Sequence, residues 1–429
     1  MTNTSWTGVN RRHVLQGTAA TAALAMTTKP RRVFGAEKTI KIGFNAPLTG
    51  AVSAWGLPGL YGCQIWGDRV NANGGLKIGN DTYMVEFVGF DNEYSPSKAR
   101  TGARKLIQED QVKFIMMLGG DTWGGVQPVM NRARMLGSTL LPSDLSSNTP
   151  YLLAPCETHP IYNVTGVDWM ADNHPELKRA VITAQSDNLG KPSIATYRAA
   201  FEARGIELVR EPLMYDPSTT DFAPIISSLL AESPDIVCLD TSYQPAVHGL
   251  TKQLQDQGFE GQIISCTCDA YKEIVKKTSK SYMNGFIYQF PDFDDSMLAN
   301  DIVNFTNPGD FYSEFVDRHP GEWSAVAWEY PAIMDLWKAG AEKAGSVEPM
   351  DVLEAMKADK TAPHAFGTGE WFGKELWGVD NALIGPWPVV RINAEGKAEI
   401  QEFRDIRKWW DKHGDLLVKH FDNMGLLPG

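Results

Sequence analysis

Short apolar runs alternate along the chain with longer stretches in which apolar residues recur at helical spacing. The runs Thr39–Phe44, Met84–Phe90 and Phe114–Leu118 predict buried strands, and the stretches 57–73 and 97–109 between them predict helices. Strands that alternate with helices in this order indicate a parallel sheet joined by right-handed crossovers. This part of the chain therefore predicts an α/β lobe.

A second array of the same kind follows, without obvious sequence identity to the first. Its predicted strands are 180–183, 207–209, 235–239 and 262–266, and its predicted helices are 162–173, 193–204, 222–232 and 246–257. The pattern then changes to long helices at 311–319 and 324–344, a hairpin-like pair at 387–393 and 398–403, and an amphipathic helix at 404–420. In open α/β sheets the ligand site lies beyond the carboxyl ends of the strands, so two such lobes predict a site in the crevice between them.

Residues 1–35 have the composition and order of an export signal. Arg11 and Arg12 precede apolar residues as in a twin-arginine signal, and a mild apolar run from Gly17 to Met26 is too short to span a membrane. Small residues suit a peptidase that cuts after Gly35. We expect export by the twin-arginine pathway, removal of the signal and a protein that works in the periplasm. The alternative is a disordered basic tail on a cytoplasmic protein.

The composition is acidic, with 52 Asp and Glu against 40 Lys and Arg and a formal net charge of −12. Cleavage after Gly35 removes five basic residues and no acidic one, so the net charge becomes −17. Such a surface repels phosphate backbones and anionic lipid, which argues against nucleic-acid or membrane partners. No later stretch approaches the ~20 apolar residues of a membrane span, and the length favours two domains.

The cysteine count is odd, which excludes a fully paired disulfide framework within one chain. The five are Cys63, Cys156, Cys238, Cys266 and Cys268. The simplest interpretation is that they are small buried apolar residues. A bridge between Cys238 and Cys266 is the alternative, because these two lie at the ends of neighbouring predicted strands.

Motifs that indicate catalysis are missing from the sequence. There is no H-E-x-x-H, G-x-S-x-G or phosphate-loop motif, and Gly367-Thr-Gly369 lacks the third glycine of a dinucleotide fingerprint. His159 and His248 are most simply structural, and the acidic segment 292–295 lacks the glycine and closing glutamate of a calcium loop. We expect a protein without enzymatic activity, catalytic residues, metal or cofactor.

Several motifs after residue 39 resemble those of one family. They are Ile40-Lys-Ile-Gly-Phe-Asn-Ala-Pro-Leu-Thr-Gly50, Trp55-Gly56, Asn71-Ala-Asn-Gly-Gly-Leu76 and Phe90-Asp-Asn92 followed by Pro96, in this order and at family spacing. With them the chain resembles the type I periplasmic substrate-binding proteins of ABC transporters, in the branched-chain amino acid (Leu/Ile/Val-binding) group. The resemblance covers 39–400 and is most specific at its amino-terminal end.

The resemblance implies a receptor whose two lobes, joined by three crossovers, close on a small polar solute and deliver it to the membrane permease of an ABC importer. It implies one lobe from 36–157 and 291–370 and another from 158–290 and 371–429. We expect a monomer. The alternatives are a ligand sensor of the same fold that feeds a signalling partner, and an exported enzyme that folds around a cofactor.

The resemblance also implies where the first lobe meets the solute. Trp55 would form an aromatic wall, with core packing as the alternative. Asp121, Thr122 and Trp123 follow the third strand, where the family offers hydroxyl and N–H donors to a ligand carboxylate at a helix N-terminus. Asp121 departs from the family, because a carboxylate beside the carboxylate of the ligand is unfavourable.

A second group of family contacts maps to the loop after the next strand. Asp144, Leu145 and Ser146 match it, and Asp144 is again an acidic departure. Their alternatives are local roles, Ser146 as a helix cap and Asp144 as a turn former.

The second lobe would contribute Asn188, Tyr243, Asp269 and Phe290. Asp269 falls near the acid that holds a ligand amine, and Phe290 would be a further wall. Aromatic faces with carboxylates suit a cationic or amine-bearing solute, whereas Thr122 and main-chain donors suit a carboxylate. An amino acid satisfies both demands. A quaternary amine, an amide or urea-like solute and an aromatic acid stay open as alternatives.

Overall fold

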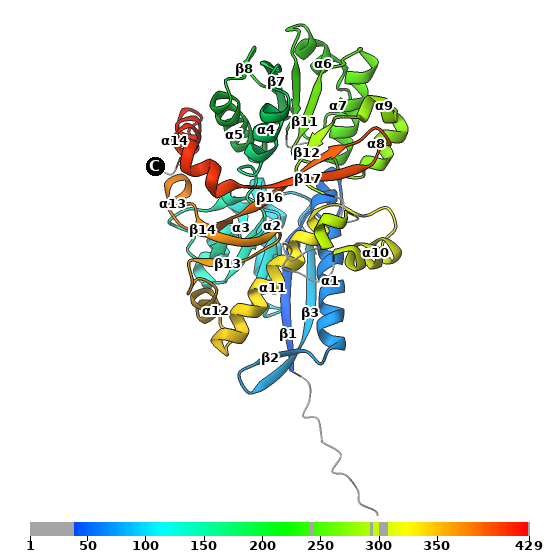
Figure 1. Cartoon of the computed structure of the whole chain (residues 1–429). Helices are drawn as coiled ribbons and strands as arrows, with labels where there is room; N and C mark the ends of the chain where they lie inside the picture. Colours follow the sequence, from blue (N-terminus) through cyan, green and yellow to red (C-terminus); the bar gives the residue numbers. More distant parts are fainter. Residues whose placement is uncertain (1–37, 241–242, 292–294, 300–307, 428–429) are drawn as a thin grey trace, which may run out of the picture. The chain divides into compact units, whose positions relative to one another are not determined.

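The computed structural model describes residues 38–240, 243–291, 295–299 and 308–427. The predicted export signal at 1–35 lies outside these residues. The described chain forms two α/β lobes, each with a mainly parallel sheet flanked by helices, which confirms the predicted fold class (Figure 1).

The first lobe is built on a six-stranded sheet. In spatial order its strands are β2 (Leu76–Ile78), β3 (Asp81–Asp91), β1 (Lys38–Ala46), β4 (Phe114–Met117), β5 (Gly137–Thr139) and β6 (Leu152–Leu153). β1 pairs in parallel with β3 and β4, so that Phe44 lies opposite Gly89 on one side and Met116 on the other. The buried run at the end of β1 follows from this central position, because helices cover both faces of a parallel sheet.

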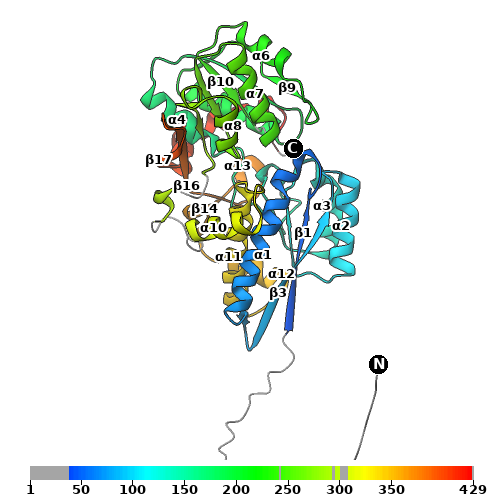
Figure 2. The ribbon, with the colours of Figure 1, turned by 90° about the vertical axis from the view of Figure 1, so that its right-hand side faces the viewer.

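Helices lie on both faces of the first sheet. They are α1 (Leu57–Ala72), α2 (Pro96–Gln108), α3 (Trp123–Ala133), α10 (Pro308–Arg318), α11 (Val326–Ala344) and α12 (Pro349–Met356), with the short 3-10 turns η1 (Ala51–Trp55), η2 (Gly120–Thr122) and η3 (Pro142–Asp144). α1 packs against α11, and α2 packs against α3. Figure 2 shows these two pairs on opposite sides of β1. The loops that follow β1, β4 and β5 are therefore held between strands and helices at one edge of the sheet.

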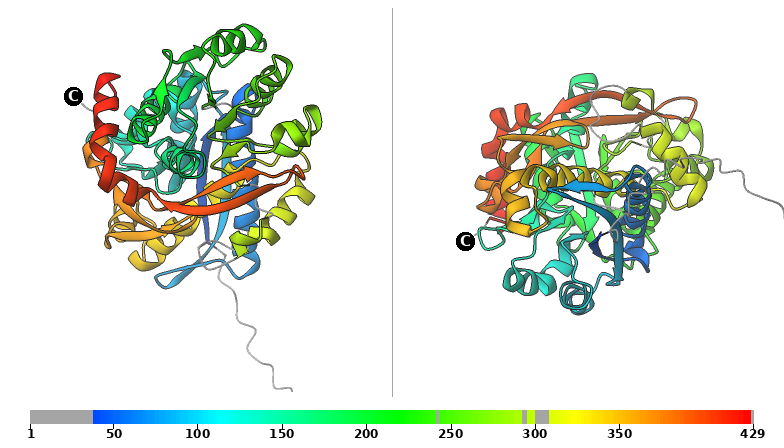
Figure 3. Two further views of the ribbon diagram at one scale, coloured as in Figure 1. Left: turned by 45° about the horizontal axis from the view of Figure 1, so that its top comes forward. Right: turned by 90° about the horizontal axis from the view of Figure 1, so that it is seen from below.

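The second lobe contains the eight-stranded sheet. Its strands run in the order β17 (Ala398–Asp405), β16 (Pro386–Ile392), β12 (Ile287–Tyr288), β11 (Gln262–Ser265), β10 (Ile236–Leu239), β7 (Arg179–Gln185) and β8 (Glu207–Leu208), and β9 (Leu213–Tyr215) also pairs with β7. The pairs from β7 to β12 are parallel, whereas β16 and β17 join the edge as an antiparallel ribbon (Figure 3).

The helices of the second lobe are α4 (Asn163–Asn173), α5 (Gly190–Ala203), α6 (Ala223–Leu230), α7 (Gln244–Asp256), α8 (Tyr271–Lys277), α9 (Lys280–Met283) and α14 (Ile406–Asn423). α14 begins where the Asp405 side chain accepts a hydrogen bond from the Arg407 backbone N–H at 2.8 Å, a helix cap. This last helix packs on α5 and α4, so the end of the chain returns to the second lobe.

A small third sheet lies where the chain passes between the lobes. Its antiparallel strands are β13 (Thr361–His364), β14 (Gly367–Phe372) and β15 (Ala382–Ile384), with α13 (Lys374–Trp377) between the last two. β15 also bridges to Ala154, which follows the last strand of the first sheet. The predicted lobe boundary at 370/371 falls inside β14, and the exact division by residue stays a prediction.

The strands and helices predicted for both arrays are present within a few residues of their expected ends. The hairpin of β2 with β3, the third sheet and the helix α12 were not predicted. All five cysteines are buried and carry thiols, as the simplest interpretation expects, and no bridge joins Cys238 to Cys266. Within the described ranges, no helix is both long and apolar enough to cross a membrane, and no cluster of three or more His, Cys, Asp or Glu is placed to bind a metal.

Candidate functional site

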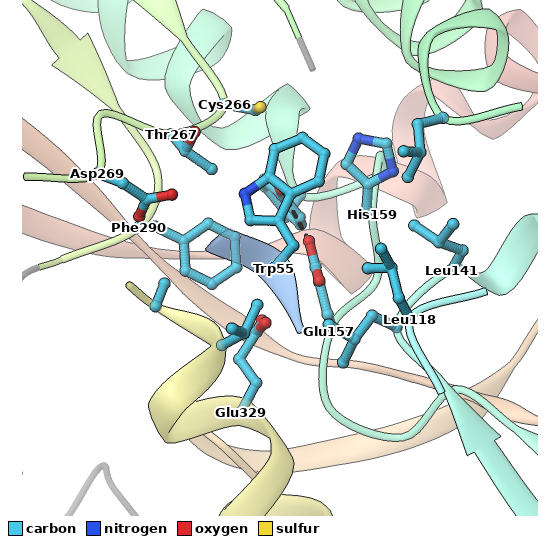
Figure 4. Close-up of a pocket in the computed structure, with 15 residues that line it drawn as sticks. Trp55, Leu118, Leu141, Glu157, His159, Cys266, Thr267, Asp269, Phe290 and Glu329 are labelled. Atoms are coloured by element: carbon cyan, nitrogen blue, oxygen red, sulfur yellow. Dashed lines mark hydrogen bonds between the residues drawn. The ribbon is translucent and has the colours of Figure 1, made fainter. Parts of the chain in front are cut away.

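Residues from both lobes line one cavity (Figure 4). Its polar and aromatic wall comprises Trp55, Glu157, His159, Tyr162, Cys266, Thr267, Asp269, Phe290 and Glu329. Its aliphatic wall comprises Leu118, Leu140, Leu141, Leu189, Ala325 and Val326. The loops that follow β1, β4 and β5 therefore meet the loops that follow β7 and β11 here, as the two predicted sheets require.

Trp55, predicted as an aromatic wall, lines the cavity and is 7% exposed. It is the last residue of η1, directly after the loop from β1. Gly56 allows this turn, because a Cβ atom there would lie 2.0 Å from the Pro47 carbonyl oxygen. The indole also meets the second lobe, since its ring stands edge-on to Tyr243 with 6.3 Å between the ring centroids.

Asp269 also lines the cavity, and it links the two lobes. Its carboxylate follows β11 of the second lobe and accepts hydrogen bonds from the Ala325 backbone and from the side chain of Trp55, both in the first lobe. Burial raises the pKa of Asp269 to about 6, and these two hydrogen bonds oppose that rise. The predicted wall Phe290 lies close by (Figure 4).

Two further carboxyl groups of the cavity, Glu157 and Glu329, were not predicted. Glu157 lies in the crossover after β6, Glu329 lies in the first turn of α11, and Figure 4 shows both side chains at the same wall of the cavity. The Tyr162 hydroxyl donates to Glu157 Oε1 at 3.1 Å. Burial raises the pKa of Glu157, and burial together with the neighbouring Glu157 raises that of Glu329.

Glu329 differs from the other two carboxyls in its hydrogen bonding. Both of its oxygens are buried, and among the described residues neither has a hydrogen-bond partner with normal geometry. Its strongest interaction is with the Glu157 carboxyl beside it, through charge and a side-chain hydrogen bond of poor geometry in which Glu329 carries the proton, and Asp269 interacts with it less strongly. A buried carboxyl without donors is unfavourable, so this wall of the cavity is the natural position for a group that donates hydrogen bonds.

An aromatic cluster closes the same wall. Tyr162 stacks on Trp387, with ring centroids 4.6 Å apart and planes 11° apart, and Phe290 stands edge-on to both rings. His159, which we predicted to be structural, lines the cavity beside this cluster. Burial lowers the pKa of His159 to about 3, so the imidazole is neutral near pH 7.

Four other predicted residues lie around a second hollow rather than around the cavity. Asp121, Trp123, Asp144 and Asn188 line it, together with parts of α5 and α14. Asp121 Oδ1 accepts a hydrogen bond from the Asn188 backbone N–H at 3.2 Å, which joins the first lobe to the second. Asp144 is buried in its own loop, where it accepts from Thr139 Oγ1 at 2.7 Å and from the Gly120 backbone N–H at 3.1 Å.

The groups of the first lobe that we predicted to donate hydrogen bonds to a ligand carboxylate instead form hydrogen bonds within their own loops. The Thr122 hydroxyl donates to the Gly119 carbonyl at 2.8 Å. The Leu145 N–H donates to the Pro142 carbonyl at 3.0 Å, and the Ser146 N–H donates to Thr149 Oγ1 at 2.8 Å. These three residues line neither the cavity nor the second hollow.

The sequence contains a weak signal for the unpredicted glutamates. Glu329 interrupts a run of apolar residues, from Val326 to Pro331, in which every residue is buried. Glu157 stands among buried residues of the crossover, with Cys156 before it. A charged residue within an apolar run marks either a buried network or a site, and the pattern alone does not distinguish them.

Comparison with known proteins agrees with this architecture. Residues 39–397 match the family model described as periplasmic binding protein. The Leu/Ile/Val-binding protein BraC3 of Rhizobium johnstonii is 26% identical over 343 residues, which cover 77% of this chain and 87% of that protein. The Leu/Ile/Val-binding protein homolog 3 of Brucella melitensis is 24% identical, with 77% and 86% covered.

Solved structures show the same fold at low sequence identity. The leucine-binding protein LivK of Thermotoga maritima superposes with a TM-score of 0.70 at 16% identity and covers 86% of this chain and all of its own length. A solute-binding protein of Rhodopseudomonas palustris in complex with p-hydroxybenzoic acid also gives 0.70, at 17% identity, with 86% and 98% covered. Because the family model matches residues 39–397, which are most of the chain, this chain belongs to the periplasmic binding protein family.

Proposed function

We propose that this protein is the solute-binding receptor of an ABC importer, which encloses a small polar solute between its lobes and presents it to a membrane permease. The observation that carries the proposal is the cavity, because both lobes contribute to its wall and a bound solute would stabilise their contact. Relatives that bind leucine, isoleucine or hydroxybenzoate are consistent with a small organic solute.

Within this proposal, Trp55, Asp269 and Phe290 contact the solute, together with Glu157 and Glu329. The twin-arginine export, the periplasmic location of the mature chain and its monomeric state belong to the same proposal. They rest on the sequence of residues 1–35 and on the family.

The experiment is a thermal-shift screen of the purified protein against amino acids, amines, betaines, amides, ureas and aromatic acids. A solute at a hundred times its Kd adds about 2.7 kcal/mol to the free energy of unfolding, which gives a clear rise in Tm. Mass spectrometry of the supernatant after denaturation shows whether a solute co-purifies. Absence of both a shift and a co-purified solute would contradict the proposal.

Trp55→Ala tests the assigned wall. Removing the indole takes away apolar contact with the solute and the donor to Asp269, so we expect at least a tenfold increase in Kd, measured by calorimetry with a solute found in the screen. Trp371→Ala, at a half-buried position in β14 outside the cavity, is the control and should leave Kd unchanged. An unchanged Kd for Trp55→Ala with a large drop in Tm would assign Trp55 to the core instead.

A further inference from the structure

The ionisable side chains around the cavity are acidic, and no strongly basic side chain balances them in the described residues. Glu157, Asp269 and Glu329 line it, and no lysine or arginine does so among the described residues. Two of these carboxyls have donors within the protein, Asp269 from Trp55 and the Ala325 backbone and Glu157 from Tyr162. The third, Glu329, has none with normal geometry in the described chain. The cavity therefore has an excess of acceptors at one wall.

The aliphatic part of the cavity lining offers little to an anion. It is formed by the leucines at 118, 140, 141 and 189. The nearby donors are engaged inside the protein, since the Gly120 N–H binds Asp144 and the Thr122 hydroxyl binds the Gly119 carbonyl. A carboxylate placed against these leucines would lose its hydration without gaining a hydrogen bond from them, and it would lie near three acidic groups.

From this arrangement we infer that the solute is a small organic cation with N–H donors and no carboxylate, whose protonated amine meets Glu329 and Glu157 and whose apolar body lies between Trp55 and the leucine wall. The inference rests on the proposed function and narrows its solute class. If charge were the only criterion, a quaternary ammonium packed against the faces of the aromatic rings would also fit the cavity. The unpartnered oxygens of Glu329 favour an amine that retains its hydrogens, because a quaternary ammonium has no N–H group to donate to them.

The test uses matched probes that differ only in the charged group. Calorimetry on ligand-free protein compares 3-methylbutylamine with leucine and with 4-methylpentanoate, and compares benzylamine with benzyltrimethylammonium and with phenylacetate. In at least one of the two series we expect the primary amine to bind at least tenfold more tightly than its amino acid, acid or quaternary relatives. Tighter binding of an amino acid or acid, with weak binding of the amines, would overturn the inference and leave the proposed function standing. Tighter binding of the quaternary probe would overturn the role of the N–H donors.

A conservative variant tests the assigned residue. Glu329→Gln should weaken binding of the favoured amine by at least tenfold, while the circular dichroism spectrum and cooperative melting show that it folds. Asp335→Asn is the matched control, because Asp335 is a partly buried carboxyl of the same helix that accepts from Trp66 Nε1 at 2.9 Å and does not line the cavity. Equal loss in both variants, or no loss in Glu329→Gln, would overturn the assignment. Failure of all six probes, together with a negative general screen and no co-purified solute, would overturn the proposed function as well.

Discussion

Asp144 and Glu329 are both buried carboxyls of the first lobe, and both have a raised pKa because of burial. Asp144, whose pKa is about 7, lies in a loop that supplies a hydroxyl and a backbone N–H to its oxygens. Glu329 faces a cavity, and its oxygens have no donor of normal geometry in the described chain. The two carboxyls are thus similarly buried, but the oxygens of Asp144 accept hydrogen bonds from its own loop, whereas those of Glu329 accept none of normal geometry in the described chain. Hydrogen bonding, rather than burial or pKa alone, separates a structural carboxyl from a candidate binding group.

Asp269 is an intermediate case, and its pH dependence should give the largest effect. Its pKa is about 6 in the folded protein and 3.8 in the reference state, so its stabilising contribution is complete below about pH 4 and is lost as pH rises through 6. Between pH 4 and pH 8 the ligand-free protein should lose up to about 3 kcal/mol of unfolding free energy relative to Asp269→Asn.

Urea unfolding of both proteins across this pH range measures the difference. Asp317→Asn, at an exposed position of α10, is the control and should run parallel to the unsubstituted protein. A difference between the protein and Asp269→Asn that does not change with pH would show that burial does not perturb Asp269.

Replacement of each carboxyl with an apolar side chain of similar size tests the difference between Asp144 and Glu329. Asp144→Leu leaves the Gly120 N–H without its acceptor and should lower the unfolding free energy by about 1–3 kcal/mol. Glu329→Met leaves no donor of normal geometry in the described chain without its acceptor. The ligand-free variant should therefore be at least as stable as the unsubstituted protein. Urea unfolding at pH 5, where the raised pKa of each group keeps it largely protonated, provides the measurement. Equal destabilisation by the two changes would remove the distinction between the two regions.

The smallest effect is expected at the hydrogen bond between Asp121 and Asn188. It joins the two lobes, but Asn188 is exposed and the bond is a single contact, so Asp121→Ala should weaken solute binding by less than about 1 kcal/mol, or up to fivefold. Calorimetry with the solute from the screen measures this change. A loss of a hundredfold would show that the second hollow, rather than the cavity, is the binding region.

The sequence predicted the fold well because the alternation of apolar strands with amphipathic helices is a local signal. β14 and β15 escaped prediction because short strands at a lobe crossing, such as Ala382–Ile384, have no periodicity of their own. For the site, the family motifs led to Trp55, Asp269 and Phe290, which do line the cavity.

Other parts of the site could not be predicted from the sequence. The loops around Thr122 and Ser146 keep the family's residue types, but their donors bind neighbouring backbone and hydroxyl groups, and sequence spacing does not reveal such pairings. Glu157 and Glu329 are 172 residues apart in the sequence, and only the tertiary packing of α11 against the crossover brings them together. Contacts of this range cannot be inferred from local patterns.

The unpartnered oxygens of Glu329 also affect how stable the empty protein is with its two lobes in contact. An empty protein with its lobes in contact keeps this carboxyl buried without a donor, whereas a separated pair of lobes would let water reach it. The empty form should therefore spend less time with its lobes together than the loaded form does. Under the proposed function, a permease that responds to the closed receptor would then meet few empty ones, and the ATPase of the importer would hydrolyse less ATP without moving solute.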